Sequence, residues 1–224
     1  MGEDPWRKRA ANPDAFDRME KEEYERIKPI LIGLLDELKC GGKIRTDFKE
    51  GEWGRLRGLI SQTKNTSESH NRLLHLFECP AKEWLKQVEE IGFKETDMTQ
   101  MYFVLASTGA ILHIEHFKQL VLFVMKDVRS FKVSDFYKTM PQVAPKSWRK
   151  LLPFLNSKLR NAFAHGAYAL DGENVVLYKD ARLDKSEKMS FSDFMILTKK
   201  HNVHYMCLID VLNEKKKDGF FHLA

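Results

Sequence analysis

The chain has 224 residues, of which 43% are apolar and 31% charged, so its composition is that of a globular protein and not of a disordered one. The formal net charge of +5 is too small to indicate a nucleic-acid-binding protein by itself. Three widely spaced cysteines argue against a disulfide framework and favour a reducing compartment, the cytoplasm. Residues 98–114 form the longest stretch without acidic or basic side chains, which is too short and too polar for a membrane helix, and no signal peptide is recognisable.

The first predicted element is a long helix over about residues 14–38. Apolar side chains between Ile27 and Leu38 recur at spacings of three and four, which places them on one helix face. Cys40-Gly41-Gly42 should end this helix, because glycine readily adopts the left-handed conformation of a helix cap. The polar residues 62–70 are predicted to form a loop. Further helices are predicted over about residues 53–61, 72–77 and 81–91.

The longest helix is predicted over about residues 98–128, with Asp97 and Gln100 as a capping pair. It is apolar on almost every side, which is typical of a helix at the centre of a bundle. A short helix is expected at about 134–140. Another helix should end at Ala164 and begin at either Trp148 or Pro153. Proline fits best in the first turn of a helix, so the residues before Pro153 would form a separate turn or a kink.

The period then changes to that of strands. Residues 167–170 and 174–178, joined by Asp171-Gly172, predict a small β-hairpin. A final helix should begin at Ser190, capped by Asp193, and reach about residue 213. The predicted fold is therefore mostly α, a helical bundle with a small β-hairpin between its last two helices. Residues 1–95 are either a helical N-terminal extension or part of the same bundle, and residues 96–224 form the core.

The charge is distributed unevenly along the chain. Residues 1–100 carry a net charge of −2, and residues 101–224 carry +7. Between residues 126 and 160, nine basic side chains are opposed only by Asp127 and Asp135, an excess that can attract a polyanion such as RNA. The alternative is a solvated surface with scattered lysines. The candidate RNA-binding residues are Lys126, Arg129, Lys132, Lys146, Arg149, Lys150 and Lys158.

The most informative segment is Arg160-Asn161-Ala162-Phe163-Ala164-His165, followed by Gly166. Helical residues turn by 100° each, so Arg160 and His165 should point about 140° apart on one helix. Asn161 and His165 are four apart and share a face, so the amide can orient the imidazole. Two such helices packed about a two-fold axis would bring both copies of these three side chains into one cleft.

This segment resembles the signature of the HEPN superfamily of helical RNA-processing domains, which is an arginine, a polar residue, three variable residues and a histidine. Residues 98–215 fit the helical core of that superfamily, whereas residues 1–95 show no resemblance. The resemblance implies a homodimer whose composite site cleaves RNA without a metal ion or other cofactor. Arg160 would hold the scissile phosphate, His165 would transfer protons and Asn161 would orient the site. Attack by the 2′-hydroxyl would leave a 2′,3′-cyclic phosphate and a 5′-hydroxyl.

Members of the superfamily act as toxins, in host defence and in RNA processing, so an antitoxin or another regulatory protein is a possible partner. The alternative function is a non-catalytic module that binds RNA or nucleotide or serves as an assembly partner. Arg160 would then pair with a surface acid, and His165 would be a helix C-cap before Gly166. Two histidine rows, His113 with His116 and His201 with His204, have a spacing that can chelate a metal, although buried structural histidines are far more common.

Overall fold

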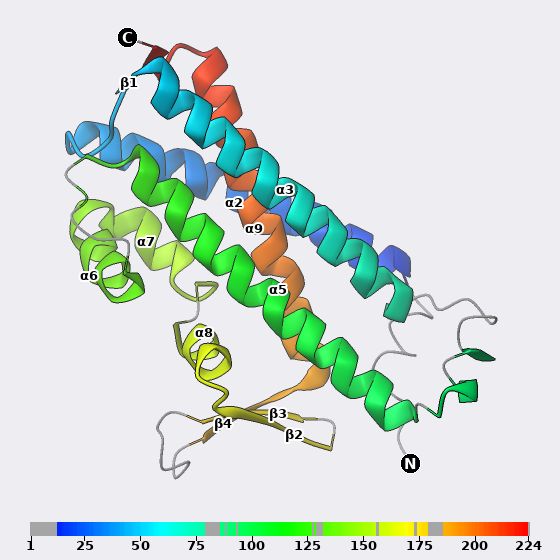
Figure 1. The fold of residues 1–224 in the computed structure, drawn as a ribbon. Helices are drawn as coiled ribbons and strands as arrows, with labels where there is room; N and C mark the ends of the chain where they lie inside the picture. Colours follow the sequence, from blue (N-terminus) through cyan, green and yellow to red (C-terminus); the bar gives the residue numbers. More distant parts are fainter. Residues whose placement is uncertain are drawn as a thin grey trace.

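The computed structural model describes residues 13–78, 86–87, 89–92, 94–126, 128, 132–155, 157–172, 174–178 and 186–223. Most of these residues are helical, as the sequence predicts (Figure 1). The long helices are α2 (Pro13–Cys40), α3 (Glu50–Glu78), α5 (Glu95–Val124) and α9 (Phe191–Lys217). The short helices are α6 (Val133–Val143), α7 (Pro145–Leu151) and α8 (Ser157–Ala164).

Helix α5 lies at the centre of the bundle, as its apolar sequence predicts. It packs against α9, α3, α6 and α8. Leu120 of α5 and Leu208 of α9 are fully buried in one cluster together with Leu31 and Leu34 of α2 and Leu56 of α3. Each side chain of this kind stabilises the fold by about 1.5–3 kcal/mol through the removal of apolar surface from water. Helices α2 and α3 therefore share the core of α5 and α9.

A second apolar cluster lies at the other end of α5, beside the sheet. Phe103 of α5 packs against Phe163 of α8 and Phe194 of α9, with ring centroids 5.7 and 5.2 Å apart. Leu159 of α8 and Val175 of the sheet are fully buried in the same cluster. This cluster holds α8 between α5 and the sheet.

The predicted β-hairpin is present as strands β2 (Tyr168–Asp171) and β3 (Asn174–Tyr178), with Tyr168 opposite Leu177. A third strand, β4 (Ser186–Ser190), pairs antiparallel with β3 and extends the hairpin into a three-stranded sheet. At the opposite end of the bundle, β1 (Asp47–Phe48) pairs parallel with β5 (His222–Leu223) (Figure 1). Helix α9 begins after Ser190, whose hydroxyl accepts a hydrogen bond from the Asp193 backbone N–H, as predicted.

Helix α3 is continuous through residues 62–70, so the predicted loop there is wrong. Two polar side chains of this stretch, Ser67 and His70, are buried against α5 and α9 rather than exposed. Lys64 and Glu68 form an exposed ion pair on the solvent side. The polar stretch is thus one helix with a polar inner face, which a search for apolar periodicity does not recognise.

Other helix boundaries differ from the prediction by a few residues. Helix α5 begins at Glu95, and Asp97 lies within its first turn, where its carboxylate accepts the Lys94 backbone N–H at 2.8 Å. The helix predicted to reach Ala164 is two helices, α7 and α8, with Pro153 in the turn between them. The helix predicted over 81–91 falls largely outside the described residues. No helix in the described ranges is both long and apolar enough to span a membrane.

Candidate functional site

Helix α8 carries the Arg160–His165 segment, and its two faces differ in burial. Leu159, Ala162 and Phe163 are buried toward α5 and the sheet. Asn161 and His165 are exposed on the other side, and Arg160 lies between the two faces with 23% of its side chain exposed. The buried apolar side of α8 therefore fixes the rotation of the helix about its own axis. Asn161 and His165 then face solvent, and Arg160 lies toward α5.

Arg160 is tethered to α5. Its Nε donates to Glu115 Oε1 at 2.9 Å, and the buried Lys118 ammonium donates to Glu115 Oε2. Burial by itself would raise the pKa of Glu115, but the hydrogen bonds from Lys118 and Arg160 outweigh it and lower the pKa. Arg160 also donates through Nη1 to Asn161 Oδ1 at 3.2 Å. The Arg160 guanidinium has five N–H groups, and three of them have no hydrogen-bond acceptor among the described residues.

His165 occupies the C-cap of α8. Its backbone N–H donates to the Asn161 carbonyl at 3.1 Å, and the Ala167 N–H then reaches back to the Ala162 carbonyl at 2.7 Å. Gly166 lies between them with φ +64°, the left-handed conformation of a Schellman cap. His165 therefore lies at the point where the Schellman cap ends the helix, with its side chain exposed.

The structure brings Arg160 and Asn161 together, but no hydrogen bond in the described part of the chain joins either side chain to the His165 imidazole. The amide oxygen of Asn161 accepts from Arg160 instead. The structure shows Arg160 hydrogen-bonded to Glu115 of α5 and His165 exposed at the cap of α8. The divergence of the two side chains, about 140°, stays a prediction from helix geometry.

Sequence reasoning missed Glu115 and Lys118, and it also missed Tyr137 of α6, whose hydroxyl donates to the Leu155 carbonyl just before α8. Burial raises the pKa of Tyr137, and the negative charge of Glu115 adds to this effect. Glu115 lies 45 residues before Arg160 in the chain. No local pattern in the sequence could have paired them.

The candidate RNA-binding residues are spread over several elements. Lys146, Arg149 and Lys150 are exposed on α7. Lys158 is exposed on α8 and forms an ion pair with Glu187 of β4 at 2.7 Å, so part of the expected charge excess is neutralised locally. The two remaining described candidates, Lys126 after α5 and Lys132 before α6, are exposed, and Arg129 lies outside the described residues.

A cleft of about 580 Å³ opens beside the C-terminal end of α5. This end of α5 lies far from the three-stranded sheet (Figure 1). Lys126 lines it together with Arg45, Asp47 and Phe123. Arg45 is already paired with Glu52, at 2.6 Å. The cleft is separate from the Arg160 segment, and of the candidate residues that the structure describes, only Lys126 contributes to its wall.

The histidine rows have structural partners. Ser67 Oγ donates to Asn202 Oδ1 at 2.7 Å, so His113 Nε2 must donate to Ser67 Oγ at 3.1 Å. His201 and His204 belong to a separate network around Glu23. Within the described ranges, no three histidine, cysteine or acidic side chains are placed to hold a metal ion.

Comparisons of the whole chain with models of protein families, with curated proteins and with solved structures find no match.

Proposed function

We propose that this protein is an endoribonuclease that needs no metal ion and acts through a composite Arg/His site at a homodimer interface. The observation that carries the proposal is the placement of the motif on α8. Glu115 and Asn161 accept two of the Arg160 N–H groups, the other three have no acceptor among the described residues, and His165 is exposed at the helix cap. The resemblance of residues 160–165 to the HEPN signature gives these side chains their roles.

The chemistry follows from the residue types. The open N–H groups of Arg160 would bind the phosphate oxygens and stabilise the charge that develops on them. The 2′-hydroxyl oxygen forms a bond to phosphorus, and the bond from phosphorus to the 5′-oxygen breaks. One histidine takes the 2′-hydroxyl proton, and a second gives a proton to the leaving oxygen. DNA lacks this hydroxyl and should not be cleaved.

A second copy supplies the second histidine, and an exposed apolar surface on α5 supports its docking there. Met101 and Val104 are 42% and 51% exposed. Thr108 and Glu115 follow on the same helix face at spacings of four and seven. Because Glu115 contacts Arg160, this face of α5 leads directly to the candidate site. The exposed side of α7 would supply cations that bind the RNA backbone.

The first experiment is RNA cleavage in EDTA by the wild type, Arg160→Ala and His165→Ala, with folding and dimer formation checked for each. We expect cleavage by the wild type alone, with 2′,3′-cyclic phosphate ends. Equal cleavage by all three proteins would contradict the assignment. So would the absence of cleavage by folded wild-type dimers across a range of RNA substrates.

A mixing experiment tests whether the site is shared between copies. The composite site uses a histidine from each copy, so a heterodimer of the wild type with His165→Ala lacks one of the two histidines. We expect this heterodimer to lose nearly all activity. A site built within one chain would leave the wild-type copy active, with about half of the wild-type activity.

The alternative is a non-catalytic module that binds RNA or nucleotide or serves as an assembly partner. The observation that favours it is the ion-pair ladder of Lys118, Glu115 and Arg160, which gives Arg160 a structural role. Such a module would retain RNA affinity and give no product at any enzyme concentration. A role in toxin or defence systems, a cytoplasmic location and control by an antitoxin or regulatory protein are further parts of the main proposal.

A further inference from the structure

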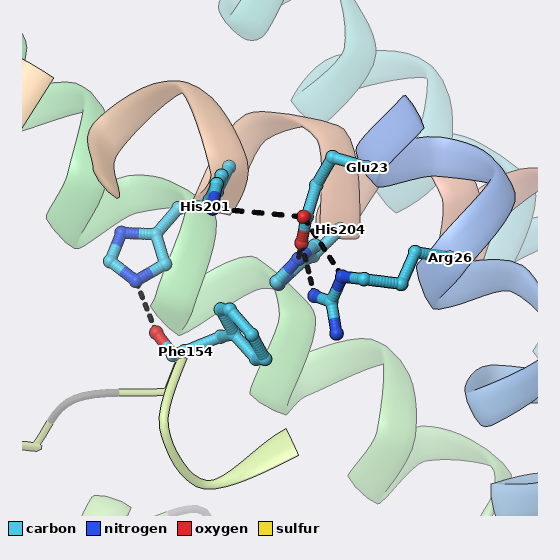
Figure 2. A network of polar contacts seen from close by, with 6 residues as sticks. Glu23, Arg26, Phe154, His201 and His204 are labelled. Carbon is cyan, nitrogen blue, oxygen red and sulfur yellow. Dashed lines mark hydrogen bonds and ion pairs between the residues drawn. The ribbon is translucent and has the colours of Figure 1, made fainter. Parts of the chain in front are cut away.

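A buried polar network joins α2 and α9 to the turn that precedes α8 (Figure 2). At its centre, the Glu23 carboxylate of α2 is 5% exposed and accepts hydrogen bonds from His204 Nε2 and from the Arg26 guanidinium. The Lys200 ammonium lies 3.8 Å away. Burial by itself would raise the pKa of Glu23, but the bonds from His204 and Arg26 lower it to about 2. The network is therefore organised around a permanent negative charge.

Phe154, in the turn between α7 and α8, is held at both its backbone and its ring (Figure 2). His201 Nε2 donates to the Phe154 carbonyl. The His204 ring meets the Phe154 ring edge to face, with centroids 4.9 Å apart, and the Arg26 guanidinium lies 4.3 Å from the same ring centroid. One network thus fixes the position of the turn from two helices.

The position of this turn matters for α8 because α8 is short. Its eight residues span about 12 Å, and a helix of this length is not stable alone in water. Its orientation depends on its buried face and on the segments at its two ends. The Schellman cap fixes the C-terminal end, and the turn at residues 152–155 leads into the N-terminal end.

The hydrogen bonds define the protonation states of both histidines. Each uses Nε2–H as a donor, and in each the buried Nδ1 has no partner in the described part of the chain. A proton on Nδ1 would therefore bury an unsatisfied N–H. Burial lowers the pKa of His201 to about 4, and it lowers the pKa of His204 despite the opposing effect of Glu23.

We propose that neutral His201 and His204 form a clamp that positions the turn at residues 152–155, and with it the direction in which α8 presents Arg160, and that acid opens this clamp. Several charged or titratable groups act on the two imidazoles, which also act on each other. These groups are Glu23 and Arg26 from α2, His113 from α5 and Lys200 from α9. The effect on RNA cleavage rests on the proposed function, but the position of the turn does not.

The test is hydrogen–deuterium exchange of the full chain without RNA. His201→Phe keeps a ring but cannot donate to the Phe154 carbonyl, so we expect exchange in residues 152–164 about tenfold faster than in the wild type at pH 7. His201→Gln places an amide nitrogen where Nε2 lies and cannot be protonated, so it should retain wild-type protection at pH 7. Between pH 6 and 4 the wild type should lose protection in this segment ahead of α3, and His201→Gln should keep more of it.

The matched control is His113→Phe, because His113 is also a buried histidine but bonds Ser67 of α3. It should loosen α3 and leave residues 152–164 unchanged. Three results would each overturn the clamp. The first is exchange in His201→Phe as slow as in the wild type, and the second is equally fast exchange in His201→Gln and His201→Phe. The third is faster exchange of residues 152–164 in the control His113→Phe. If His201→Phe does not fold, the wild-type pH series decides, since simultaneous loss of protection in α3 and residues 152–164 also overturns it. A nuclease assay that fails leaves these exchange results intact, so the two proposals are tested separately.

Discussion

Removal of the Glu115 carboxylate should destabilise the fold, because it leaves the Lys118 ammonium buried without its partner. Lys118 is 5% exposed, and its ammonium donates to Glu115 Oε2. Loss of one member of a buried ion pair typically costs about 3–5 kcal/mol. Glu115 is 22% exposed, which gives water some access to the site, so we expect the lower value of about 2–3 kcal/mol for Glu115→Leu.

Urea unfolding at pH 7 measures this cost as a lower midpoint at an unchanged m-value. The double variant Glu115→Leu with Lys118→Met removes both charges, so it should recover most of the loss. Glu68→Ala, in the exposed pair with Lys64, is the control and should change the free energy of unfolding by no more than about 0.5 kcal/mol. A cost below about 1 kcal/mol for Glu115→Leu, or a double variant as unstable as the single one, would refute the reasoning.

Three further perturbations have expected outcomes. Burial lowers the pKa of His201 from 6.5 to about 4, so the unfolded chain binds more protons than the folded one between these pH values. The free energy of unfolding should therefore fall by up to about 3 kcal/mol as the pH falls through this window. Unfolding curves measure this loss, which should be smaller in His201→Gln. Glu37 of α2 caps α7 by accepting the Ser147 backbone N–H at 2.9 Å and its hydroxyl at 2.8 Å, so Glu37→Ala should cost about 1–2 kcal/mol, and an unchanged Tm would contradict this role. A Cβ at Gly109 would lie 2.2 Å from His70 Nε2, so Gly109→Ala should lower Tm, and adding His70→Ala should restore part of the loss.

The sequence predicted most of the fold where each element carries a local signal. The apolar pattern of α2 and α5, the cap at Ser190 and the hairpin of residues 167–178 are all readable within a few residues, and the structure confirms them, although Asp171 pairs with Asn174 as the last residue of β2 and is not part of the turn. Strand β4 was missed because its sequence, Ser-Glu-Lys-Met-Ser, is mostly polar and gains its strand conformation from pairing with β3.

The surroundings of the candidate site could be predicted only in part. The Arg160–His165 spacing predicts that one helix directs the two side chains apart, and the structure places Arg160 toward α5 and His165 at the cap. The partners that hold them are remote in sequence. Glu115 is 45 residues from Arg160, and Phe154 is 47 residues from His201, so these contacts follow from tertiary packing and not from any local pattern.

The cap of α8 also determines how chains with a similar site should be searched for. The end of α8 directly after the motif depends on a left-handed residue at position 166 and on the Ala167 bond back to Ala162. A search pattern that stops at the histidine omits the two residues that terminate the helix there, whereas one that extends to a glycine after the histidine selects chains in which the helix can end directly after the motif. By the same reasoning, a non-glycine residue at 166 strains the backbone of this cap without altering any residue of the motif itself.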